Sequence, residues 1–244
     1  MSLFNKKIVH SGDGEDARRI ISDKTPFAVT EAFKALYTKI LYLPIASQCK
    51  KIAITSAESG EGKTYVACNL AITLAQNSRE KRVLLVDGDM RKPRISRLLN
   101  EYVGASNTLV GLSEYLASIT EEPAIVNSSL PNLDILYSGK ESANPVGLIN
   151  SSRMQGLFDW CADKYDYVII DTPPAGLVAD TVLLSNKIDG YIVTARADYT
   201  NGNSLSEVVC SLQNIGAEVF GIVLSSVNPK KSSGSAYSKK SAYY

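Results

Sequence analysis

The residues best suited to chemistry in this chain are a lysine and a hydroxyl at the end of a glycine-containing loop. Lys63 and Thr64 close the stretch KIAITSAESGEGKT, where Gly60 and Gly62 let the backbone approach an anion without an intervening Cβ. The lysine would reach the terminal phosphates of ATP, and the hydroxyl would bind Mg²⁺. The spacing predicts a phosphate-binding P-loop, although Ala57 replaces the first glycine of the usual pattern.

Two elements must position this loop. Ile52–Ile54 is an apolar run typical of a buried strand, and Val66–Ala75 has apolar residues at helical spacing. Backbone N–H groups at the start of such a helix point at a bound anion, and the helix dipole favours negative charge there. The residues expected to bind nucleotide are Ser59, Gly60, Glu61, Gly62, Lys63, Thr64 and Tyr65.

Two further apolar runs end in aspartates. The first is Arg82–Asp87, followed by Gly88 and Asp89, and the second is Tyr167–Asp171. Residues two apart in a strand point the same way, so Asp87 and Asp89 would both project from the carboxyl end of one strand. Active sites of α/β sheets lie at that end. Asp171 would hold Mg²⁺ through water or orient the attacking group, although it could also cap the next element.

Strand patterns alternate with helical patterns along most of the chain. This order implies an α/β fold of the P-loop NTPase type, with a mainly parallel sheet and helices on both faces. Residues 95–130 are expected to form short helices and loops, and Ala179–Asn186 a helix. We predict a flexible arm at 1–25, one P-loop domain at 26–227 and a disordered tail at 228–244.

The composition narrows the function classes. The chain has 244 residues, of which 45% are hydrophobic, and a formal net charge of +1, so no global field favours nucleic acid. No apolar run approaches the roughly 18 residues needed to span a bilayer and no signal peptide opens the chain, so membrane association is expected only through a partner. The cysteines Cys49, Cys68, Cys161 and Cys210 are far apart, which is typical of reduced thiols in a cytoplasmic protein.

The tail carries three tyrosines among serines and lysines. Tyr237, Tyr243 and Tyr244 are unusual in a purely solvating segment. Either the tail is a low-complexity end with chance tyrosines, or it presents phenols that are flexible enough to enter an active site. The sequence of the tail alone leaves both interpretations open.

Together these motifs resemble a known family, the bacterial tyrosine kinases, specifically the stand-alone cytoplasmic kinases of capsule and exopolysaccharide systems. The resemblance covers nearly the whole chain from about Pro26. Its landmarks are TSAESGEGKT at Thr55–Thr64, VLLVDGDMRKP at Val83–Pro93, GLSEYL at Gly111–Leu116, LDILYSG at Leu133–Gly139, YDYVIIDTPP at Tyr165–Pro174 and the tyrosine-bearing tail.

The resemblance implies a fold related to the partitioning and septum-site ATPases. It also implies ATP-dependent phosphorylation of tyrosine, mainly on the tail of a neighbouring subunit, with control of polysaccharide synthesis and export. Lys63 and the loop amides would hold the phosphates, while Thr64, Asp87 and Asp171 surround Mg²⁺. Asp89 is the candidate that orients or deprotonates the tyrosine hydroxyl. The implied phosphorylated residues are Tyr237, Tyr243 and Tyr244.

The same resemblance implies partners. A membrane-anchored adaptor would recruit the cytoplasmic kinase to the inner face of the membrane and stimulate it, subunits would form a ring, and a dedicated phosphatase would reverse the phosphorylation. Glu31 and Lys34 would lie at the subunit contact. Lys34 and Tyr37 replace the two arginines that the family usually has there, and lysine lacks the planar bidentate fork of arginine. Tyr65 replaces a small hydroxyl residue, so the α-phosphate contact would rest on backbone alone.

Two other functions fit parts of the sequence. A partitioning-type switch ATPase would share the P-loop, but it carries a signature lysine where this chain has Glu58, and it lacks a tyrosine tail. A nucleotide-bound scaffold with weak catalysis would explain the departures at Tyr37 and Tyr65. An assay for phosphotyrosine separates these alternatives from a kinase.

Overall fold

Parallel strands dominate the molecule, which the computed structural model describes for residues 6–9, 20–22, 24–78, 80–103 and 110–227. In this part of the chain eight strands form one sheet in the order β1-β8-β7-β2-β6-β3-β5-β4, and β4 alone runs antiparallel to its neighbour. The strands are β1 (Lys6–Val9), β2 (Lys50–Ser56), β3 (Val83–Asp87), β4 (Ile125–Asn127), β5 (Leu133–Leu136), β6 (Tyr167–Asp171), β7 (Gly190–Arg196) and β8 (Val219–Val227).

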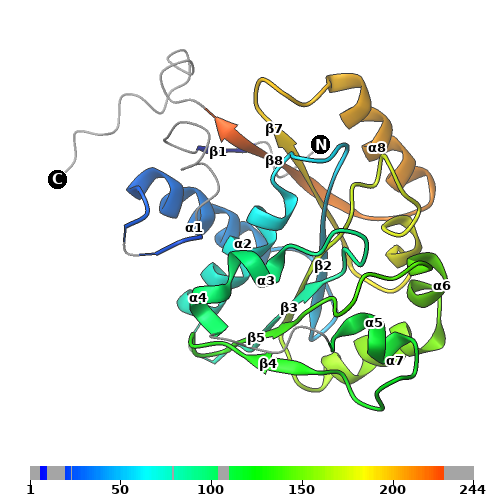
Figure 1. The fold of residues 1–244 in the computed structure, drawn as a ribbon. Helices are drawn as coiled ribbons and strands as arrows, with labels where there is room; N and C mark the ends of the chain where they lie inside the picture. The colour runs from blue at the N-terminus through cyan, green and yellow to red at the C-terminus, as the bar shows by residue number, and fades with distance from the viewer. Residues whose placement is uncertain (1–5, 10–19, 23, 79, 104–109, 228–244) are drawn as a thin grey trace, which may run out of the picture.

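Helices cover both faces of the sheet (Figure 1). One hydrophobic cluster packs α1 to α4 against one face, and a second packs α5 to α8 and the short η2 against the other. The helices are α1 (Phe27–Leu41), α2 (Lys63–Asn77), α3 (Ile95–Leu98), α4 (Asn100–Val103), α5 (Leu112–Leu116), α6 (Pro145–Ile149), α7 (Ser152–Ala162), η2 (Val182–Leu184) and α8 (Gly202–Asn214). This arrangement confirms the predicted fold class.

The central strands read as continuous apolar runs because both of their faces are covered. Every residue of β3 and β6 is buried, and so are the last five residues of β2. Strand β6 lies between β2 and β3, although it follows both in the sequence. The P-loop and the two acid-tipped strands therefore end side by side at the carboxyl edge of the sheet.

One predicted helix is largely absent from the structure. The helix expected at Ala179–Asn186 is reduced to the single 3-10 turn η2, so that prediction is wrong over most of its length. Polar tertiary contacts explain this: the Asp180 carboxylate accepts from Arg91, and the Thr181 carbonyl accepts from the Tyr191 hydroxyl. These contacts draw the segment away from regular helical bonding.

Two edge strands were not expected from local pattern. Strand β4 lies within residues 95–130, where the sequence predicts short helices and loops, and it forms by pairing with β5. Strand β1 comes from the segment predicted as an arm and pairs with β8. The tail at 228–244, with Tyr237, Tyr243 and Tyr244, lies outside the described residues.

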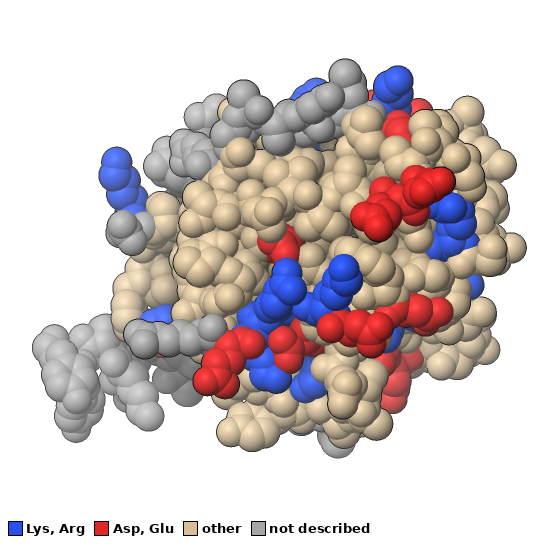
Figure 2. Space-filling model, turned by 90° about the horizontal axis from the view of Figure 1, so that it is seen from below, with Lys and Arg blue, Asp and Glu red and all other residues tan. Residues whose placement is uncertain are grey.

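The state of the cysteines and the mixed surface charge match what the wide cysteine spacing and the near-zero net charge suggest. The four cysteines are free, and three of them are buried. Among the described helices, none combines the length and the apolar character needed to cross a membrane. On the face shown in Figure 2, lysine and arginine side chains lie interspersed with aspartate and glutamate, so this face carries no extended patch of one sign.

The packing of α1 against α2 allows a prediction of how two phenylalanines contribute to the free energy of unfolding. Phe33 is fully buried, whereas Phe27 on the same helix is 78% exposed. We expect Phe33→Ala to lower the free energy of unfolding by about 3–5 kcal/mol, because it leaves a cavity between the helices. Phe27→Ala should change it by less than about 0.5 kcal/mol. Urea unfolding of both variants measures the difference, and equal effects would contradict the packing described here.

Candidate active site

The P-loop joins β2 to α2 through two left-handed glycines. Gly60 has φ 86° and Gly62 has φ 91°, a conformation that side chains rarely adopt. Gly62 is the N-cap residue of α2, and no side chain caps the first turn. The first N–H groups of a helix have no partner within it, so here they remain available for an anion.

Three residues from the end of β7 to the start of α8 donate hydrogen bonds to the P-loop. The buried Glu61 carboxylate accepts from the Glu58 N–H at 2.8 Å and, in a short contact, from the Thr200 hydroxyl. The Tyr199 hydroxyl donates to the Ser59 carbonyl at 3.2 Å, and the Arg196 guanidinium donates to the Gly60 carbonyl at 3.4 Å. The Glu61 side chain therefore stabilises the loop, and the backbone N–H of Glu61 is the group left to contact a nucleotide.

Tyr65 points away from the loop. Its ring is buried edge-on against Phe33, with 5.9 Å between the ring centroids. Burial raises the pKa of its hydroxyl above the ordinary value. The backbone N–H of this residue is left as its possible contact with nucleotide, as the sequence suggested.

Two aspartates face each other across neighbouring strands. Asp87 on β3 and Asp171 on β6 are in register, and both are buried. Asp87 Oδ2 accepts from the Ile95 N–H at 3.1 Å, but Asp87 Oδ1 and both Asp171 oxygens have no hydrogen-bond partner among the described residues. Gly88 keeps them close, because its N–H donates to the Asp171 carbonyl and a Cβ there would lie 2.8 Å from that oxygen.

Burial makes these carboxylates costly to ionise. Desolvation is the largest cause that raises the pKa of Asp87, and the neighbouring Asp171 raises it further. Desolvation also raises the pKa of Asp171, while the positive charge of Lys63 partly offsets that effect. A cation bound beside these carboxylates would offset the cost of ionising them.

The donor set fits a magnesium ion that is shared with a nucleotide. Magnesium prefers oxygen ligands and is usually held by one or two carboxylates together with phosphates and water. Asp87, Asp171 and the Thr64 hydroxyl supply such oxygens at the start of α2. The described residues contain no cluster of three or more Asp, Glu, His or Cys that could hold a metal alone, so phosphate would complete the set.

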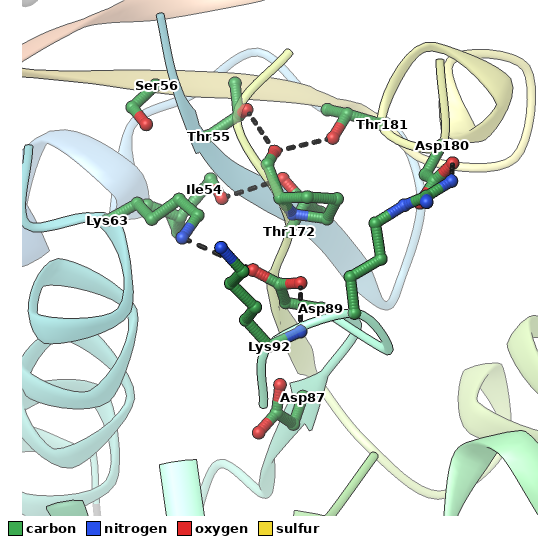
Figure 3. A network of polar contacts seen from close by, with 12 residues as sticks. Ile54, Thr55, Ser56, Lys63, Asp87, Asp89, Lys92, Thr172, Asp180 and Thr181 are labelled. Atoms are coloured by element: carbon green, nitrogen blue, oxygen red, sulfur yellow. Dashed lines mark hydrogen bonds and ion pairs between the residues drawn. The ribbon is translucent and has the colours of Figure 1, made fainter. Parts of the chain in front are cut away.

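Asp89 forms an ion pair with the P-loop lysine. Its Oδ2 lies 3.5 Å from Lys63 Nζ, and its Oδ1 accepts from the Lys92 N–H at 3.0 Å (Figure 3). Both side chains of the ion pair are almost fully buried. The structure places Lys63, Asp87, Asp89 and Asp171 at one edge of the sheet, where Asp89 contacts the lysine and Asp87 pairs with Asp171.

An ion pair between an exposed arginine and a buried aspartate joins the loops that carry these acids, and local sequence gave no signal for it. Arg91 donates to both oxygens of Asp180, at 2.7 and 3.0 Å. The loop after β6 is also tied to β2, since the Thr172 hydroxyl donates to the Ile54 carbonyl (Figure 3). The pairing of Arg91 with a residue 89 positions away can be seen only in the folded chain.

The residues predicted for a subunit contact lie elsewhere, on α1. Lys34 donates to Glu31 at 3.0 Å, and both side chains are exposed. The Tyr37 hydroxyl donates to the Asn77 carbonyl of α2 within the same chain. These residues do not approach the P-loop.

Comparison with known proteins gives consistent matches. Residues 49–220 match the family model described as an AAA domain. The tyrosine-protein kinase YwqD of Bacillus subtilis is 33% identical over 90% of this chain and 91% of its own. The kinase domain of Escherichia coli tyrosine kinase ETK superposes with a TM-score of 0.76 at 28% identity, covering 87% of this chain and 84% of that chain.

A more distant likeness concerns the fold alone. The septum site-determining protein MinD from Pyrococcus horikoshii, solved with Mg-ADP, has a TM-score of 0.59 at 24% identity. The match covers 72% of this chain and 70% of that chain. It confirms the predicted relation to the septum-site ATPase fold.

The unpartnered Asp171 leads to a prediction of opposite effects on stability and binding. Asp171→Asn keeps the shape but removes a buried charge, so the metal-free variant should be more stable than the wild type by about 1–3 kcal/mol at pH 8. The gain should be smaller at pH 5. A folded pKa raised above the unfolded value of about 3.9 makes the wild type lose stability as pH rises through that window.

Urea unfolding in the presence of a chelator measures this gain. The stabilisation that Mg-ATP confers on the wild type should be absent in Asp171→Asn, because binding to the folded state is what shifts the midpoint. Asp166→Asn is the matched control, since Asp166 is paired with Lys81 at the other end of β6, and it should leave Mg-ATP stabilisation intact. A wild type more stable than Asp171→Asn at pH 8 would refute the prediction.

Proposed function

Since the chain belongs to the bacterial tyrosine-protein kinase family, we propose that it transfers the γ-phosphate of ATP to tyrosines in the tail of a neighbouring copy. The observation that carries this proposal is the meeting of Lys63 with Asp89 beside the Asp87–Asp171 pair. A cation, a carboxylate that can accept a proton and a pair of acids that can hold a metal are the groups that phosphoryl transfer to a hydroxyl requires.

The P-loop lysine and the second aspartate have successive roles in this mechanism. When ATP binds, Lys63 turns from Asp89 to the terminal phosphates and neutralises their charge. Asp89 is then free to accept a hydrogen bond from the acceptor phenol. A bond forms between the phenolic oxygen and the γ-phosphorus, the bond to the β,γ-bridging oxygen breaks, and its electron pair leaves with ADP.

The phenolic proton passes to Asp89 late in this step. A free phenol has a pKa near 10 and is a poor nucleophile at neutral pH, so positioning and charge neutralisation must provide most of the acceleration. Asp87, Asp171 and Thr64 would hold Mg²⁺, which when bound neutralises phosphate charge and orients the chain of phosphates. The helix amides at Gly62 and beyond orient the same groups.

The biological setting follows from the family and remains a proposal. We infer a cytoplasmic kinase that a membrane-anchored adaptor recruits to the inner face of the membrane and activates. It would control capsule or exopolysaccharide synthesis, and a cognate phosphatase would reverse its action. A ring of copies is supported by the exposure of Glu31 and Lys34 together with Phe27 and Tyr42 on and beside α1.

Phosphate on the tail would supply the switch. Phosphorylation of Tyr237, Tyr243 and Tyr244 adds roughly −1.5 to −2 charge each. The added charge would reverse the sign of a lysine-rich segment and make neighbouring tails repel one another. Loss of the ring on phosphorylation is therefore the expected consequence.

A phosphotyrosine assay tests the kinase. Purified full chain, incubated with Mg-ATP and the cytoplasmic tail of the adaptor, should gain phosphotyrosine. Lys63→Met should abolish the signal, whereas Lys81→Met, a change at a surface lysine paired with Asp166, should not alter it. Replacement of Tyr237, Tyr243 and Tyr244 together by Phe should remove the signal while leaving ATP binding intact. ATP hydrolysis without any phosphotyrosine would instead favour a switch ATPase.

The role of Asp89 has its own test. Asp89→Asn keeps the bond to the Lys92 N–H but cannot accept the phenolic proton. We expect the rate of transfer to fall about 10²–10⁴-fold, the range for loss of a general base, with little change in the KM for ATP. An unchanged rate constant would show that Asp89 acts only on Lys63.

A further inference from the structure

A cavity of about 520 Å³ opens beside the P-loop and contains none of the four catalytic residues named above. It lies between the first residues of the loop, Ala57–Ser59, the segment Ala175–Leu177 after β6, and one face of α8. The loop that lines it also leads to Lys63. A molecule bound in this cavity is therefore adjacent to the phosphate site without occupying it.

The lining of the cavity favours a cation over an anion, although the Arg196 guanidinium lies 5.0 Å from the ring centroid of the lining residue Tyr199. Val208 and Leu212 of α8 are buried and form an apolar part of the lining. The carboxylates in the lining are those of Glu58 and Glu207, and no lysine, arginine or histidine among the described residues contributes to it. The two carboxylates flank an apolar surface, so the cavity suits a positively charged peptide that also carries an aromatic or aliphatic side chain. The same carboxylates repel phosphate.

Two partly exposed side chains suit an aromatic guest. Leu177 is 62% exposed and Tyr199 is 52% exposed, and both line the cavity. The Tyr199 hydroxyl is fixed on the Ser59 carbonyl, which holds its ring beside the loop. An incoming phenol can pack on these surfaces as its hydroxyl approaches the phosphate site.

We propose that this cavity is an acceptor subsite that selects tyrosines flanked by lysine, and that its occupant is the segment 228–244 of a second copy. This inference rests on the proposed kinase function and names the feature by which its acceptor is chosen. Glu58 and Glu207 bind the ammonium groups of Lys239 and Lys240, which lie between Tyr237 and the terminal pair of tyrosines.

Charge and chain length support this occupant. The segment contains four lysines and no acidic residue, so its charge complements the cavity. The described chain ends at Val227 of β8, and Ser225 on that strand donates to the Glu61 carbonyl of the P-loop. At about 3.4 Å per residue, the 13 residues from Val227 to Lys240 can span roughly 44 Å, which lets the lysines act well beyond the domain that carries them.

Peptide kinetics test the selection. The enzyme is the full chain with Tyr237, Tyr243 and Tyr244 replaced by Phe, so its own tail cannot compete, and phosphate on the added peptide is measured separately from the enzyme. A peptide of sequence 228–244, the native peptide, is compared with a charge-reversed peptide that carries Lys239→Glu and Lys240→Glu. Since exposed ion pairs are each worth at most about fivefold and charge reversal adds repulsion, we expect KM to rise about 5- to 30-fold with kcat changed less than about twofold.

A charge swap distinguishes recognition from a structural effect. Glu207→Lys, made in the same chain with the three tail tyrosines replaced, should raise the KM of the native peptide and lower that of the charge-reversed peptide, since opposite charges are restored. Glu218→Lys is the matched control, because Glu218 is exposed beyond the end of α8 and outside the cavity. It should leave both KM values unchanged.

The results distinguish a failure of the acceptor subsite from a failure of the kinase function. Equal KM values for the two peptides, or a Glu207→Lys variant that weakens both, would overturn the acceptor subsite while the kinase function stands. A chain that binds Mg-ATP but phosphorylates neither peptide, nor its own tail in the assay of the preceding subsection, would overturn the kinase function itself. If the peptides show no preference and Glu207→Lys disrupts self-association, the cavity belongs to the contact between folded domains instead.

Discussion

The burial of Asp87 and Asp171 side by side, with three oxygens unpartnered among the described residues, is the constraint on which the rest of the structure depends. Removing two carboxylates from water is unfavourable unless a cation or hydrogen bonds compensate. The sheet nevertheless keeps them in register on adjacent strands, and Gly88 brings the following loop directly onto the Asp171 carbonyl. Such a pair fits a metal that is bound together with phosphate.

The surrounding contacts keep that site rigid from three sides. The Arg91–Asp180 pair joins the loop after β3 to the loop after β6, and the Thr172 hydroxyl joins the latter to β2. Glu61 and Thr200 connect the P-loop to the segment before α8. Each contact is long-range and partly or fully buried. These contacts therefore oppose any rearrangement that would move the two buried acids apart. A site held in this way is preorganised, as electrostatic stabilisation of phosphoryl transfer requires.

Within this framework, Asp89 differs from the metal-binding pair because it already has a cationic partner. Its contact with Lys63 occupies a lysine that phosphate would otherwise attract. In the proposed mechanism, nucleotide binding and the freeing of a proton acceptor would be coupled through this one side chain. The acidic cavity beside the loop would hold a basic acceptor without competition for the phosphate site. The opposite charge preferences of the two sites would then keep donor and acceptor apart.

Local sequence was sufficient to predict the site because its parts lie at strand ends. The apolar runs before Lys63, Asp87 and Asp171 are long enough to identify buried parallel strands, and parallel strands place their carboxyl ends at one edge. The glycines, the lysine and the threonine of the P-loop then have a specific chemistry by type and spacing. The family and the fold class were contained in these short-range patterns, and the same patterns selected the four candidate side chains.

Tertiary structure alone decided which side chains face one another. The turn of Tyr65 into the core against Phe33, the brace formed by Glu61, and the pairing of Arg91 with Asp180 depend on residues far apart in the sequence. The same holds for η2, where polar contacts of Asp180 and Thr181 prevent the predicted helix, and for β4, which exists only as a partner of β5. Local propensity is worth tenths of a kcal/mol per residue, whereas buried polar contacts are worth about 1 kcal/mol or more, so the long-range contacts prevail.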